Sequence, residues 1–342
     1  MTNHDAPRVA VIGAGSWGTA VAALAAQNTE VSLWARDPVL ARSIDVEHTN
    51  PTYLPGIELP AGIRATSDLV AASRDAAVIV MAVPSHGFRA VLTELRAIGV
   101  PDHVPIVSLA KGVEQGSQLR MTQVIAEVLG THAPGTIGVL TGPNLAREVA
   151  EGQPTAAVIA FTDPETATRL QPVFMTRTFR VYTNSDVVGC ELAGALKNVI
   201  AIAAGIAAGL GYGDNTKAAL ITRGLAELAR LGVTLGGEPF TFSGLAGLGD
   251  LVATCTSEKS RNRTVGFQLG QGHSLDAIMA EMKMVAEGVK STRSIVAIAG
   301  AAGVEMPIAS AVDAVLDGRE HVKDLVPALM LRQAKPERLG PA

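Results

Sequence analysis

Hydrophobic and polar positions along the chain follow two different periods, and the first region is typical of a sheet covered by helices. Short continuous apolar runs alternate there with longer helical stretches. Continuous apolar runs are typical of parallel strands that are buried on both faces, and right-handed crossovers join such strands into a doubly wound sheet. The runs predict strands over residues 8–13, 30–35, 76–84, 104–110, 136–143 and 155–161, and a helix over 18–27.

The second region follows residues 179–189 and has helical periodicity with almost no β-rich alternation. It predicts helices over 219–235, 274–288, 291–303 and 308–318, joined by loops that contain Gly, Pro and Ser. A chain of 342 residues also exceeds what one hydrophobic core usually supports. We therefore expect two domains, an α/β domain over 1–189 and an all-α domain over 190–342.

A lysine interrupts the most apolar stretch of the chain, ELAGALKNVIAI at 191–202. The stretch approaches the length of a membrane span, but Lys197 and Asn198 break it and Ala and Gly dominate it, so we expect a buried helix and no span. The same-face neighbours of the lysine are all small: Ala193, Gly194, Ala201 and Ala204. They leave room for a second group, which favours a functional lysine over one that snorkels to solvent or forms a plain ion pair.

Composition and charge narrow the class of protein. The chain is 48% hydrophobic and 18% charged, with a net charge of −4, so it offers no basic field for nucleic acid. Cys190 and Cys255 provide neither a disulfide framework nor metal-ligand spacing, so we expect no metal. The first residues lack a basic and then apolar signal segment, and we expect a cytoplasmic protein.

A dinucleotide fingerprint follows the first predicted strand. Gly13, Gly15 and Gly18 form GxGxxG between the strand and a helix, which is the context that the motif requires. The first glycine allows the tight turn, the second lets the backbone approach a pyrophosphate, and the third allows close packing of helix on strand. This predicts a Rossmann-like N-terminal domain that binds NAD(P).

The end of the second predicted strand leaves the choice of cofactor open. Arg36 there is followed directly by Asp37. An arginine at the ribose position would pair with the 2′-phosphate of NADPH, whereas an aspartate would favour the free hydroxyl of NADH, and a surface ion pair at a turn is a third interpretation. We favour NADPH with tolerance of NADH.

Other strand ends carry polar groups at the edge where a doubly wound sheet binds its ligand. Lys111 follows a strand that is too apolar for a sheet edge, although a solvated loop lysine would look the same. Asn144 follows Gly142 and Pro143, and it could equally cap the next helix. His86 fits a structural role better than a catalytic one.

A second polar cluster lies in the segment 242–266 of the helical region. Asp250 and Thr254 are four residues apart and share a helix face, although Asp250 could simply cap that helix. Ser260, Arg261, Asn262 and Arg263 follow, and an arginine fork beside hydroxyl and amide donors suits a phosphate, although a solvated helix start is the alternative. Glycines surround the segment and indicate turns or close approaches: Gly244, Gly247, Gly249 and Gly266.

Taken in order, these motifs resemble the bacterial NAD(P)-dependent sn-glycerol-3-phosphate dehydrogenases. The matching stretches cover nearly the whole chain and are GAGSWGTA, NPTYLPG, VPSH, AKG, TGPNLA, ELAGALKNVIAI, KAALITRGL, GLAGLGDLVATC, SRN and VAEG. Position 144 departs from the serine that is frequent in the family, which puts the detail of that contact in doubt and not the function.

The resemblance implies a homodimer that interconverts dihydroxyacetone phosphate and sn-glycerol 3-phosphate with NADPH or NADH and supplies the backbone of phospholipids. It implies Lys197 as the catalytic acid and base. It implies substrate contacts at Lys111, Gly142, Asn144, Lys197, Asn198, Asp250, Thr254, Ser260, Arg261 and Asn262. It implies cofactor contacts at Ser16, Trp17, Arg36, Lys111, Ala146, Arg261, Val285 and Glu287, beside the three glycines of the fingerprint.

Two other functions remain open on the residues alone. A dehydrogenase for 6-phosphogluconate or a 3-hydroxyacid also combines such a domain with helices and a lysine, although an SRNR cluster suits phosphate better than a bare carboxylate. A redox sensor that binds NADPH without turnover would have no use for Lys197.

Overall fold

The computed structural model describes residues 8–282, 286–334 and 336–337. Its internal contacts divide the chain into two compact units. The first contains Met1–Ala110 and Met121–Val187, and the second contains Lys111–Arg120 and Val188–Ala342. The ten residues Lys111–Arg120 therefore leave the first unit in mid-sequence and belong to the second.

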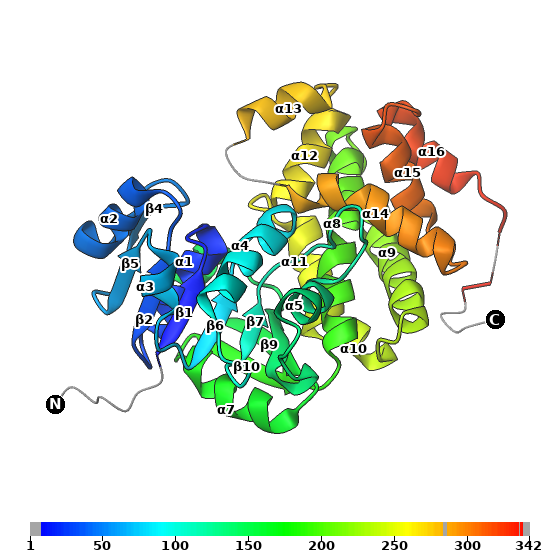
Figure 1. Cartoon of the computed structure of the whole chain (residues 1–342). Helices are drawn as coiled ribbons and strands as arrows, with labels where there is room; N and C mark the ends of the chain where they lie inside the picture. The colour runs from blue at the N-terminus through cyan, green and yellow to red at the C-terminus, as the bar shows by residue number, and fades with distance from the viewer. Residues whose placement is uncertain (1–7, 283–285, 335, 338–342) are drawn as a thin grey trace. The chain divides into compact units, whose positions relative to one another are not determined.

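The first unit contains an eight-stranded sheet with helices on both faces (Figure 1). Its strand order is β10-β9-β8-β7-β6-β1-β2-β5, so the chain reverses direction across the sheet between β1 and β6. The strands are β1 Val9–Ile12, β2 Val31–Trp34, β5 Ile63–Thr66, β6 Val78–Met81, β7 Ile106–Ser108, β8 Ile137–Thr141, β9 Thr155–Phe161 and β10 Phe179–Asn184. A two-stranded sheet is formed by β3 Thr49–Asn50 and β4 Leu54–Glu58. The predicted doubly wound α/β domain is confirmed.

One pair of strands corrects the expectation of a wholly parallel sheet. β9 pairs antiparallel with β8, and β10 pairs parallel with β9. A parallel return needs a crossover of a dozen or more residues that usually includes a helix lying along the sheet. The connection after β8 contains α6, which covers Ala146–Ala150 and is too short for that crossover, so the chain turns back beside the strand it has just left.

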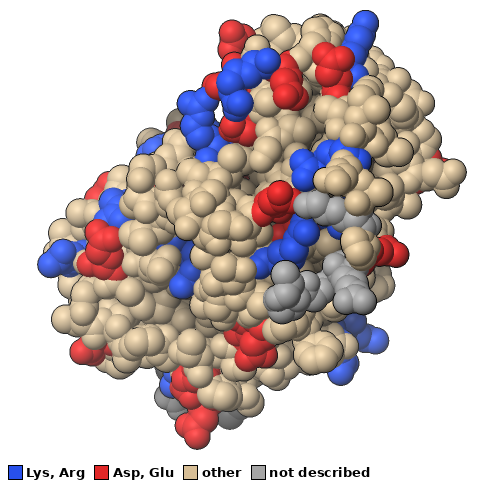
Figure 2. All heavy atoms as spheres, turned by 90° about the vertical axis from the view of Figure 1, so that its right-hand side faces the viewer, with Lys and Arg blue, Asp and Glu red and all other residues tan. Residues whose placement is uncertain are grey.

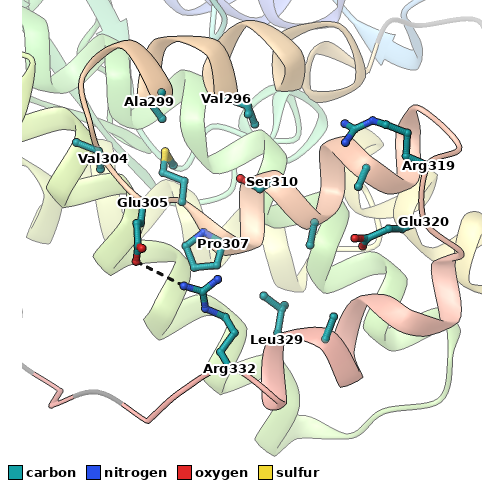
Figure 3. A pocket seen from close by; sticks show the side chains of 15 residues that line it. Val296, Ala299, Val304, Glu305, Pro307, Ser310, Arg319, Glu320, Leu329 and Arg332 are labelled. Atoms are coloured by element: carbon teal, nitrogen blue, oxygen red, sulfur yellow. Dashed lines mark hydrogen bonds and ion pairs between the residues drawn. The ribbon is translucent and has the colours of Figure 1, made fainter.

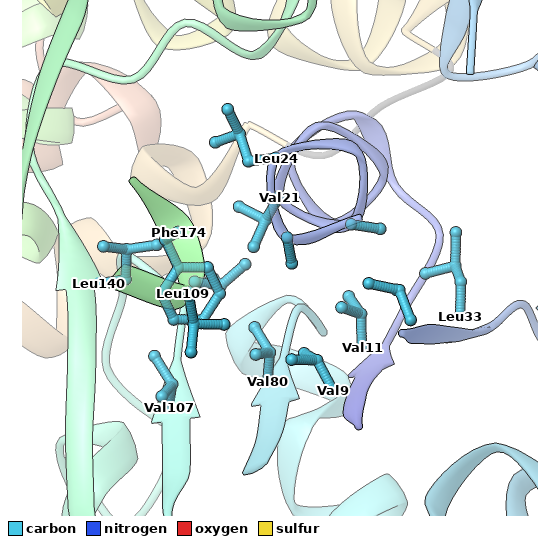
Figure 4. Packing of buried hydrophobic residues seen from close by; sticks show 14 of the residues in the cluster. Val9, Val11, Val21, Leu24, Leu33, Val80, Val107, Leu109, Leu140 and Phe174 are labelled. Atoms are coloured by element: carbon cyan, nitrogen blue, oxygen red, sulfur yellow. The ribbon is translucent and has the colours of Figure 1, made fainter. Parts of the chain in front are cut away.

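Valine-rich strands fill the core of this unit (Figure 4). Val9 and Val11 of β1 and Val80 of β6 are fully buried, and α1 places Val21 and Leu24 over them. The helices of the unit are α1 Ser16–Ala25, α2 Pro38–Glu47, α3 Leu69–Ser73, α4 Ser85–Ile98, α5 Met121–Leu129, α6 and α7 Pro164–Phe174, with a 3-10 turn at Pro134–Thr136. α1 packs with α6 and α7, whereas α3, α4 and α5 pack in a second layer.

The second unit is helical throughout its described residues, as predicted. Its helices are α8 Val187–Gly209, α9 Asp214–Thr234, α10 Pro239–Ser243, α11 Asp250–Thr256, α12 Arg261–Gly270, α13 Leu275–Glu281, α14 Glu287–Ala301, α15 Pro307–Leu316 and α16 Leu325–Met330. A π-helical turn, η2, covers Leu245–Gly249, and a 3-10 turn, η3, covers Val322–Asp324.

The central helix α8 contains the lysine-interrupted stretch. Every residue from 191 to 207 is buried, which explains why the helix is apolar on all sides. By length and composition α8 could cross a membrane, but 89% of its most apolar stretch is buried inside the protein. The helix therefore forms the core of this unit, as expected from the lysine and the small residues that interrupt its apolar run.

Glycines bring α8 and α12 into backbone contact. A Cβ atom at Gly205 would lie 2.1 Å from the carbonyl oxygen of Arg263, and one at Gly266 would lie 2.0 Å from that of Ile202. Neither helix could carry a larger residue at these positions without moving away from the other. This contact holds the polar start of α12 beside the residues that follow Lys197 on α8.

One predicted helix is wrong in its limits. We expected a single helix over 274–288, but α13 ends at Glu281 and α14 begins at Glu287. At Gly288 an added Cβ would lie 2.9 Å from the carbonyl oxygen of Asn198. The first turn of α14 therefore packs closely on α8, and an apolar period does not report such a contact.

Charged side chains on the face of the molecule drawn in Figure 2 are of mixed sign, with basic and acidic groups interspersed. The net charge of the chain is −4. Among the described residues, the visible part of this face shows no extended basic stripe of the kind that tracks a nucleic-acid backbone.

Candidate functional site

The segment Lys111–Arg120 is fixed to the helical unit at several points. The side chain of Val113 is 2% exposed and lies in the core of that unit. Arg120 pairs with Glu191 of α8 at 2.5 Å, and the Gln115 amide donates to the carbonyl oxygen of Lys290 at 2.9 Å. A segment held at both ends and in the middle can present Lys111 in one position.

The Lys197 side chain is buried in the same unit, at 5% exposure, and its ammonium has two protein partners. Nζ donates to Oδ1 of Asp250 at 2.5 Å and to Oγ1 of Thr254 at 2.6 Å. The Thr254 hydroxyl donates its own proton to the Asp250 carbonyl oxygen at 2.6 Å, so a lone pair faces the lysine. An ammonium has three donors, and among the described residues these two partners use two of them.

Asp250 joins two lysines that lie 86 positions apart in the sequence. Its Oδ2 accepts from Nζ of Lys111 at 2.8 Å while Oδ1 accepts from Lys197, and the carboxylate is 2% exposed. Asp250 is not the N-cap of α11, which is Gly249, and no side-chain bond from the N-cap closes the helix start; as the acidic residue of the first turn, Asp250 still lies at the positive end of the helix dipole. Lys111 is likewise no solvated loop lysine, since its side chain is 16% exposed.

Burial lowers the pKa of Lys197 from its ordinary value to about 8. Asp250 opposes this change, Lys111 adds to it, and Cys255 opposes it weakly. The group is therefore able both to give and to take a proton near neutral pH. Burial also raises the pKa of the adjacent Cys255 thiol to about 12, which keeps that sulfur protonated.

Two asparagines link Lys111 to the start of α14. The Asn198 amide donates to the Lys111 carbonyl oxygen at 2.8 Å, and Asn262 donates to Oδ1 of Asn198 at 2.9 Å. Oδ1 of Asn262 in turn accepts the backbone N–H of Gly288 at 2.9 Å. We call these three bonds the asparagine relay. Both residues were expected to contact the substrate, and the structure shows their side chains bonded within the protein.

The start of α12 carries the predicted phosphate group of residues. Ser260 is its N-cap and accepts the backbone N–H of Arg263 at 3.3 Å. Burial lowers the pKa of the Arg261 guanidinium, and the Glu287 carboxylate opposes that shift, so these two predicted cofactor contacts lie close enough to interact. Val285, predicted to contact the cofactor, lies outside the described residues.

The glycine fingerprint in the first unit has the geometry that its motif predicts. Gly13 has φ of +118°, and a Cβ there would lie 2.7 Å from the carbonyl oxygen of Ala82. A Cβ at Gly18 would lie 2.0 Å from the carbonyl oxygen of Gly13, whereas one at Gly15 would meet nothing within 4 Å. The turn is therefore tight on the protein side and open at Gly15, where a pyrophosphate needs space.

Helix α1 supplies the other features of a dinucleotide site. Its N-cap is Gly15, which has no side chain to cap the first turn, so the helix start is suited to an anion. Trp17 in that turn has a buried Nε1 with no partner among the described residues. A buried donor of this kind is costly unless a ligand satisfies it, and these residues fit NAD(P).

Arg36 and Asp37 differ in their hydrogen bonding and exposure. Asp37 is the N-cap of α2, and its carboxylate accepts the backbone N–H of Val39 at 2.9 Å. Arg36 precedes it at the end of β2 and is exposed. The aspartate therefore has a local structural partner, while the arginine extends into solvent.

The strand end after β8 holds Gly142, Asn144 and Ala146. Asn144 does not cap the next helix, because the N-cap of α6 is Leu145 and α6 starts at Ala146. The side-chain amide of Asn144 has both Nδ2 and Oδ1 buried without a partner among the described residues. An unsatisfied amide suits a contact with a ligand. His86 lies exposed in the first turn of α4.

A separate hollow of about 490 Å³ lies among α14, α15 and α16 (Figure 3). Glu305 and Arg332 pair at its edge at 3.5 Å, and Ser310 points into it. None of the residues predicted for substrate or cofactor lines it.

Comparison with known proteins gives the family. Residues 8–167 match the NAD-dependent glycerol-3-phosphate dehydrogenase N-terminus, and residues 186–327 match the C-terminus of the same family. The chain belongs to the NAD-dependent glycerol-3-phosphate dehydrogenase family. The family resemblance expected from the sequence motifs is therefore confirmed.

Individual members of the family match over almost their whole length. The chain is 54% identical over 336 residues to glycerol-3-phosphate dehydrogenase (NAD(P)+) of Nocardia farcinica, covering 96% of this chain and 99% of that protein. It is 52% identical over 327 residues to glycerol-3-phosphate dehydrogenase (NAD(P)+) 2 of Sphingopyxis alaskensis, covering 94% and 96%. The crystal structure of glycerol-3-phosphate dehydrogenase from Coxiella burnetii matches with a TM-score of 0.90 and 37% identity, over 96% of this chain and 99% of that one.

Two interactions that hold the candidate site in place were not predicted from the sequence. Arg120 and Glu191 form a largely buried ion pair that fixes the Lys111 segment to α8. Gly288 closes the asparagine relay through its backbone, where a Cβ would lie 2.8 Å from Oδ1 of Asn262. A glutamate at the start of an apolar helix was a usable signal for the first, since such a charge needs a partner. The sequence held no signal for the second.

Proposed function

We propose that this chain interconverts dihydroxyacetone phosphate and sn-glycerol 3-phosphate, with NAD(P)H as the source of a hydride for C2. The observation that carries the proposal is the buried ammonium of Lys197, held by Asp250 and Thr254, with a third donor that no other residue in the described part of the chain takes up and that can serve a substrate oxygen. Membership of the family and the names of the matching relatives support it.

The proton transfer follows from the geometry of the lysine. During ketone reduction Lys197 gives a proton from Nζ to the C2 oxygen as that oxygen gains negative charge, and in the reverse direction the neutral amine takes it back. Asp250 favours the ammonium form, while burial and Lys111 favour the amine. The balance between them gives a pKa of about 8, at which both forms are accessible.

The substrate phosphate is assigned to the start of α12. Ser260, Arg261 and Asn262 lie at the first turn of that helix, where backbone N–H groups and the helix dipole attract an anion. The Arg261 guanidinium adds a planar set of donors that matches phosphate oxygens. Binding at the phosphate can then orient C2 for reaction, because binding energy from a remote group contributes to positioning. Lys111 and Asn198 complete the substrate set.

The cofactor is assigned to the first unit. We propose that the turn of Gly13, Gly15 and Gly18 and the start of α1 at Ser16 hold the pyrophosphate, and that Trp17 and Ala146 contribute further contacts. Gly142 and Asn144, which precede Ala146, are assigned to the substrate. NADPH is the proposed preference. It is supported by the exposed Arg36 and by the use of Asp37 as a helix cap.

The direct test follows the loss of reduced-nicotinamide absorbance as NADPH or NADH is oxidised, with dihydroxyacetone phosphate as substrate. The proposal expects turnover with this substrate and at least about 100-fold lower kcat/KM with a 3-oxoacid, or with 6-phosphogluconate and NADP+ in the direction of oxidation. Tight NADPH binding without turnover would favour the non-catalytic sensor. Faster reduction of a 3-oxoacid, or faster oxidation of 6-phosphogluconate with NADP+, would show that the substrate is a different one.

We also propose that the chain works as a cytoplasmic homodimer that supplies glycerol 3-phosphate for phospholipid synthesis. Light scattering after size-exclusion chromatography measures the mass in solution directly. A mass of one chain at micromolar concentration would reject the dimer and leave the proposed reaction intact.

A further inference from the structure

The helix that carries Asp250 and Thr254 does not start as an ordinary α-helix. The five residues Leu245–Gly249 before it form a π-helical turn, and the Gly249 N–H donates to the carbonyl oxygen of Gly244 at 3.1 Å. Such turns are rare and occur often at functional sites. A π turn encloses one residue more than an α turn, so it changes the direction in which the next helix face points.

Gly247 fixes the position of this turn. It is buried, and a Cβ there would lie 2.1 Å from the carbonyl oxygen of Phe242 and 2.5 Å from its Cα. Phe242 is itself held, because it is 1% exposed and its ring lies where a Cβ of Gly232 on α9 would be, at 2.0 Å. A continuous line of contact therefore runs from α9 through Phe242 to the π turn.

The face that the turn presents is the one on which the lysines depend. Asp250 and Thr254 are buried, whereas Leu248 and Val252 on the other side are 37% and 39% exposed. The Asp250 carboxylate must reach two ammonium groups at 2.8 and 2.5 Å at once. A small rotation of the turn would break at least one of these two bonds.

We propose that Gly247 is a positioning residue for the reaction. Its close contact with the Phe242 backbone fixes the π turn, and the π turn orients Asp250 toward Lys111 and Lys197. The inference rests on the proposed function, in which Lys197 moves the proton. It assigns to a glycine outside the ion-pair network a role that acts through Asp250.

The role predicts an effect that a general loss of stability would not produce. In Gly247→Ala the added methyl group collides with the Phe242 carbonyl, so the turn and Asp250 must shift. Lys197 faces Asp250, Lys111 and Cys255 among the described residues, and of these Asp250 gives the largest opposition to the lowering of its pKa. With Asp250 withdrawn the ammonium loses its proton at lower pH, and the alkaline limb of ketone reduction moves the same way.

The experiment compares the pH dependence of kcat/KM for dihydroxyacetone phosphate with NADPH in wild type, Gly247→Ala and a control. The control is Gly209→Ala at the end of α8, where a Cβ would lie a similar 2.2 Å from the carbonyl oxygen of Phe267. Twelve residues of helix separate Gly209 from Lys197, or about 18 Å. We expect the alkaline limb to move down by about half a pH unit or more in Gly247→Ala, with kcat reduced about tenfold. The control is expected to unfold at lower temperature with its alkaline limb unmoved.

Phe242→Leu keeps the test decisive if Gly247→Ala does not fold. The shorter side chain fills less of the space against α9, so the Phe242 backbone that contacts Gly247 is held less firmly. We therefore expect the alkaline limb of kcat/KM to move to lower pH by a smaller amount than in Gly247→Ala. An unmoved alkaline limb in the folded variant, with turnover reduced or not, would overturn the inference. Absence of turnover in the wild type would instead reject the proposed function, so the two failures are distinguishable.

Discussion

The Lys197 ammonium is the group on which the proposed chemistry depends most directly. Because its pKa is lowered to about 8, the ammonium form is lost as the pH rises through that value. Ketone reduction consumes a proton from this form, so kcat/KM for dihydroxyacetone phosphate should fall above about pH 8, while oxidation of glycerol 3-phosphate should rise over the same range. Initial rates over roughly pH 6 to 10 measure both limbs; a reduction rate that stays flat throughout this range would contradict the assignment.

Removal of the ammonium tests the same residue in another way. Lys197→Met keeps the length of the side chain, and we expect kcat to fall about 10²- to 10⁴-fold while the NADPH dissociation constant changes by less than about twofold. Fluorescence titration measures the binding. Lys217→Met on α9 is the matched control, because Lys217 pairs with Asp214 on the surface. A Lys197 variant within a few-fold of wild-type turnover would exclude this lysine as the proton donor.

The asparagine relay gives a prediction about substrate affinity. In Asn262→Asp the bond to Gly288 can persist, but the donor to Asn198 becomes an acceptor and the two oxygens repel. Leaving a buried polar group unsatisfied costs about 1–3 kcal/mol. If the side chains shift to avoid this cost and displace Lys111 and the start of α12 from the substrate, KM for dihydroxyacetone phosphate should rise by up to the same free energy, about 5- to 150-fold. Asn28→Asp, which breaks two bonds of the first unit to Val173 and Met175, should leave that KM unchanged. Equal KM values in the wild type, Asn262→Asp and Asn28→Asp would show that the asparagine relay does not affect substrate affinity.

Sequence reasoning at the residue scale found the charged groups and missed how some are held. Lys197 was recognisable because an isolated charge in an apolar run needs a partner. Lys111 was recognisable from its place at a strand end, and Asp250 from the helix face that it shares with Thr254. The bonding of Asn198 and Asn262 was not, because an amide can bond to almost any polar neighbour and the sequence does not say which. The bond from Gly288 uses a backbone N–H, which every residue except proline carries, so the residue type at this position gives no sign of the bond.

At the scale of elements, α9 and α15 are joined by a buried carboxylate. Glu227 on α9 is 2% exposed and accepts the backbone N–H groups of Ile308 at 2.7 Å and Ala309 at 3.3 Å, in the first turn of α15. Burial raises its pKa to about 7, against the two backbone bonds that lower it. The carboxylate serves as a cap supplied by another helix.

This cap predicts a dependence of stability on pH. A carboxyl group whose pKa is raised on folding contributes stability that is present below its unfolded value and is lost as the pH rises through about 7. Glu227→Gln does not titrate, so the wild type should lose about 2–3 kcal/mol relative to that variant between pH 5 and 7.5. Thermal unfolding of both proteins at the two pH values measures the difference. A constant difference between them would show that Glu227 does not titrate in this range.

Strands were easier to predict than their direction or the limits of the helices. Continuous apolar runs identified the six predicted strands, because burial on both faces leaves a plain signature. The reversed direction of β9 depends on the short α6 connection, which an apolar run does not report. The π turn escaped prediction for a related reason, since it depends on the contact of Gly247 with a backbone carbonyl five residues earlier.

At the scale of the whole molecule, cofactor binding should appear as stabilisation. A ligand at about 100 times its dissociation constant stabilises the folded state by about 2.7 kcal/mol. If Arg36 binds the 2′-phosphate, NADPH should raise the unfolding midpoint more than NADH at equal concentration. Arg36→Ser should remove that difference, because an ionic hydrogen bond of about 1.5–3 kcal/mol is lost. Asp37→Asn is the matched control, since asparagine also caps helices well; equal shifts with both cofactors in the wild type would contradict the preference.

Because Lys111–Arg120 belongs to the helical unit, that unit is difficult to produce as a separate fragment. A recombinant fragment that begins at Val188 would omit these ten residues. It would leave a void where Val113 packs and would deprive both Asp250 and Glu191 of a cationic partner. The helical half therefore cannot be produced intact from one uninterrupted stretch of the gene. Its isolation requires the excised loop to be returned, either as a separate peptide or by permuting the chain so that residues 111–120 are covalently joined to Val188.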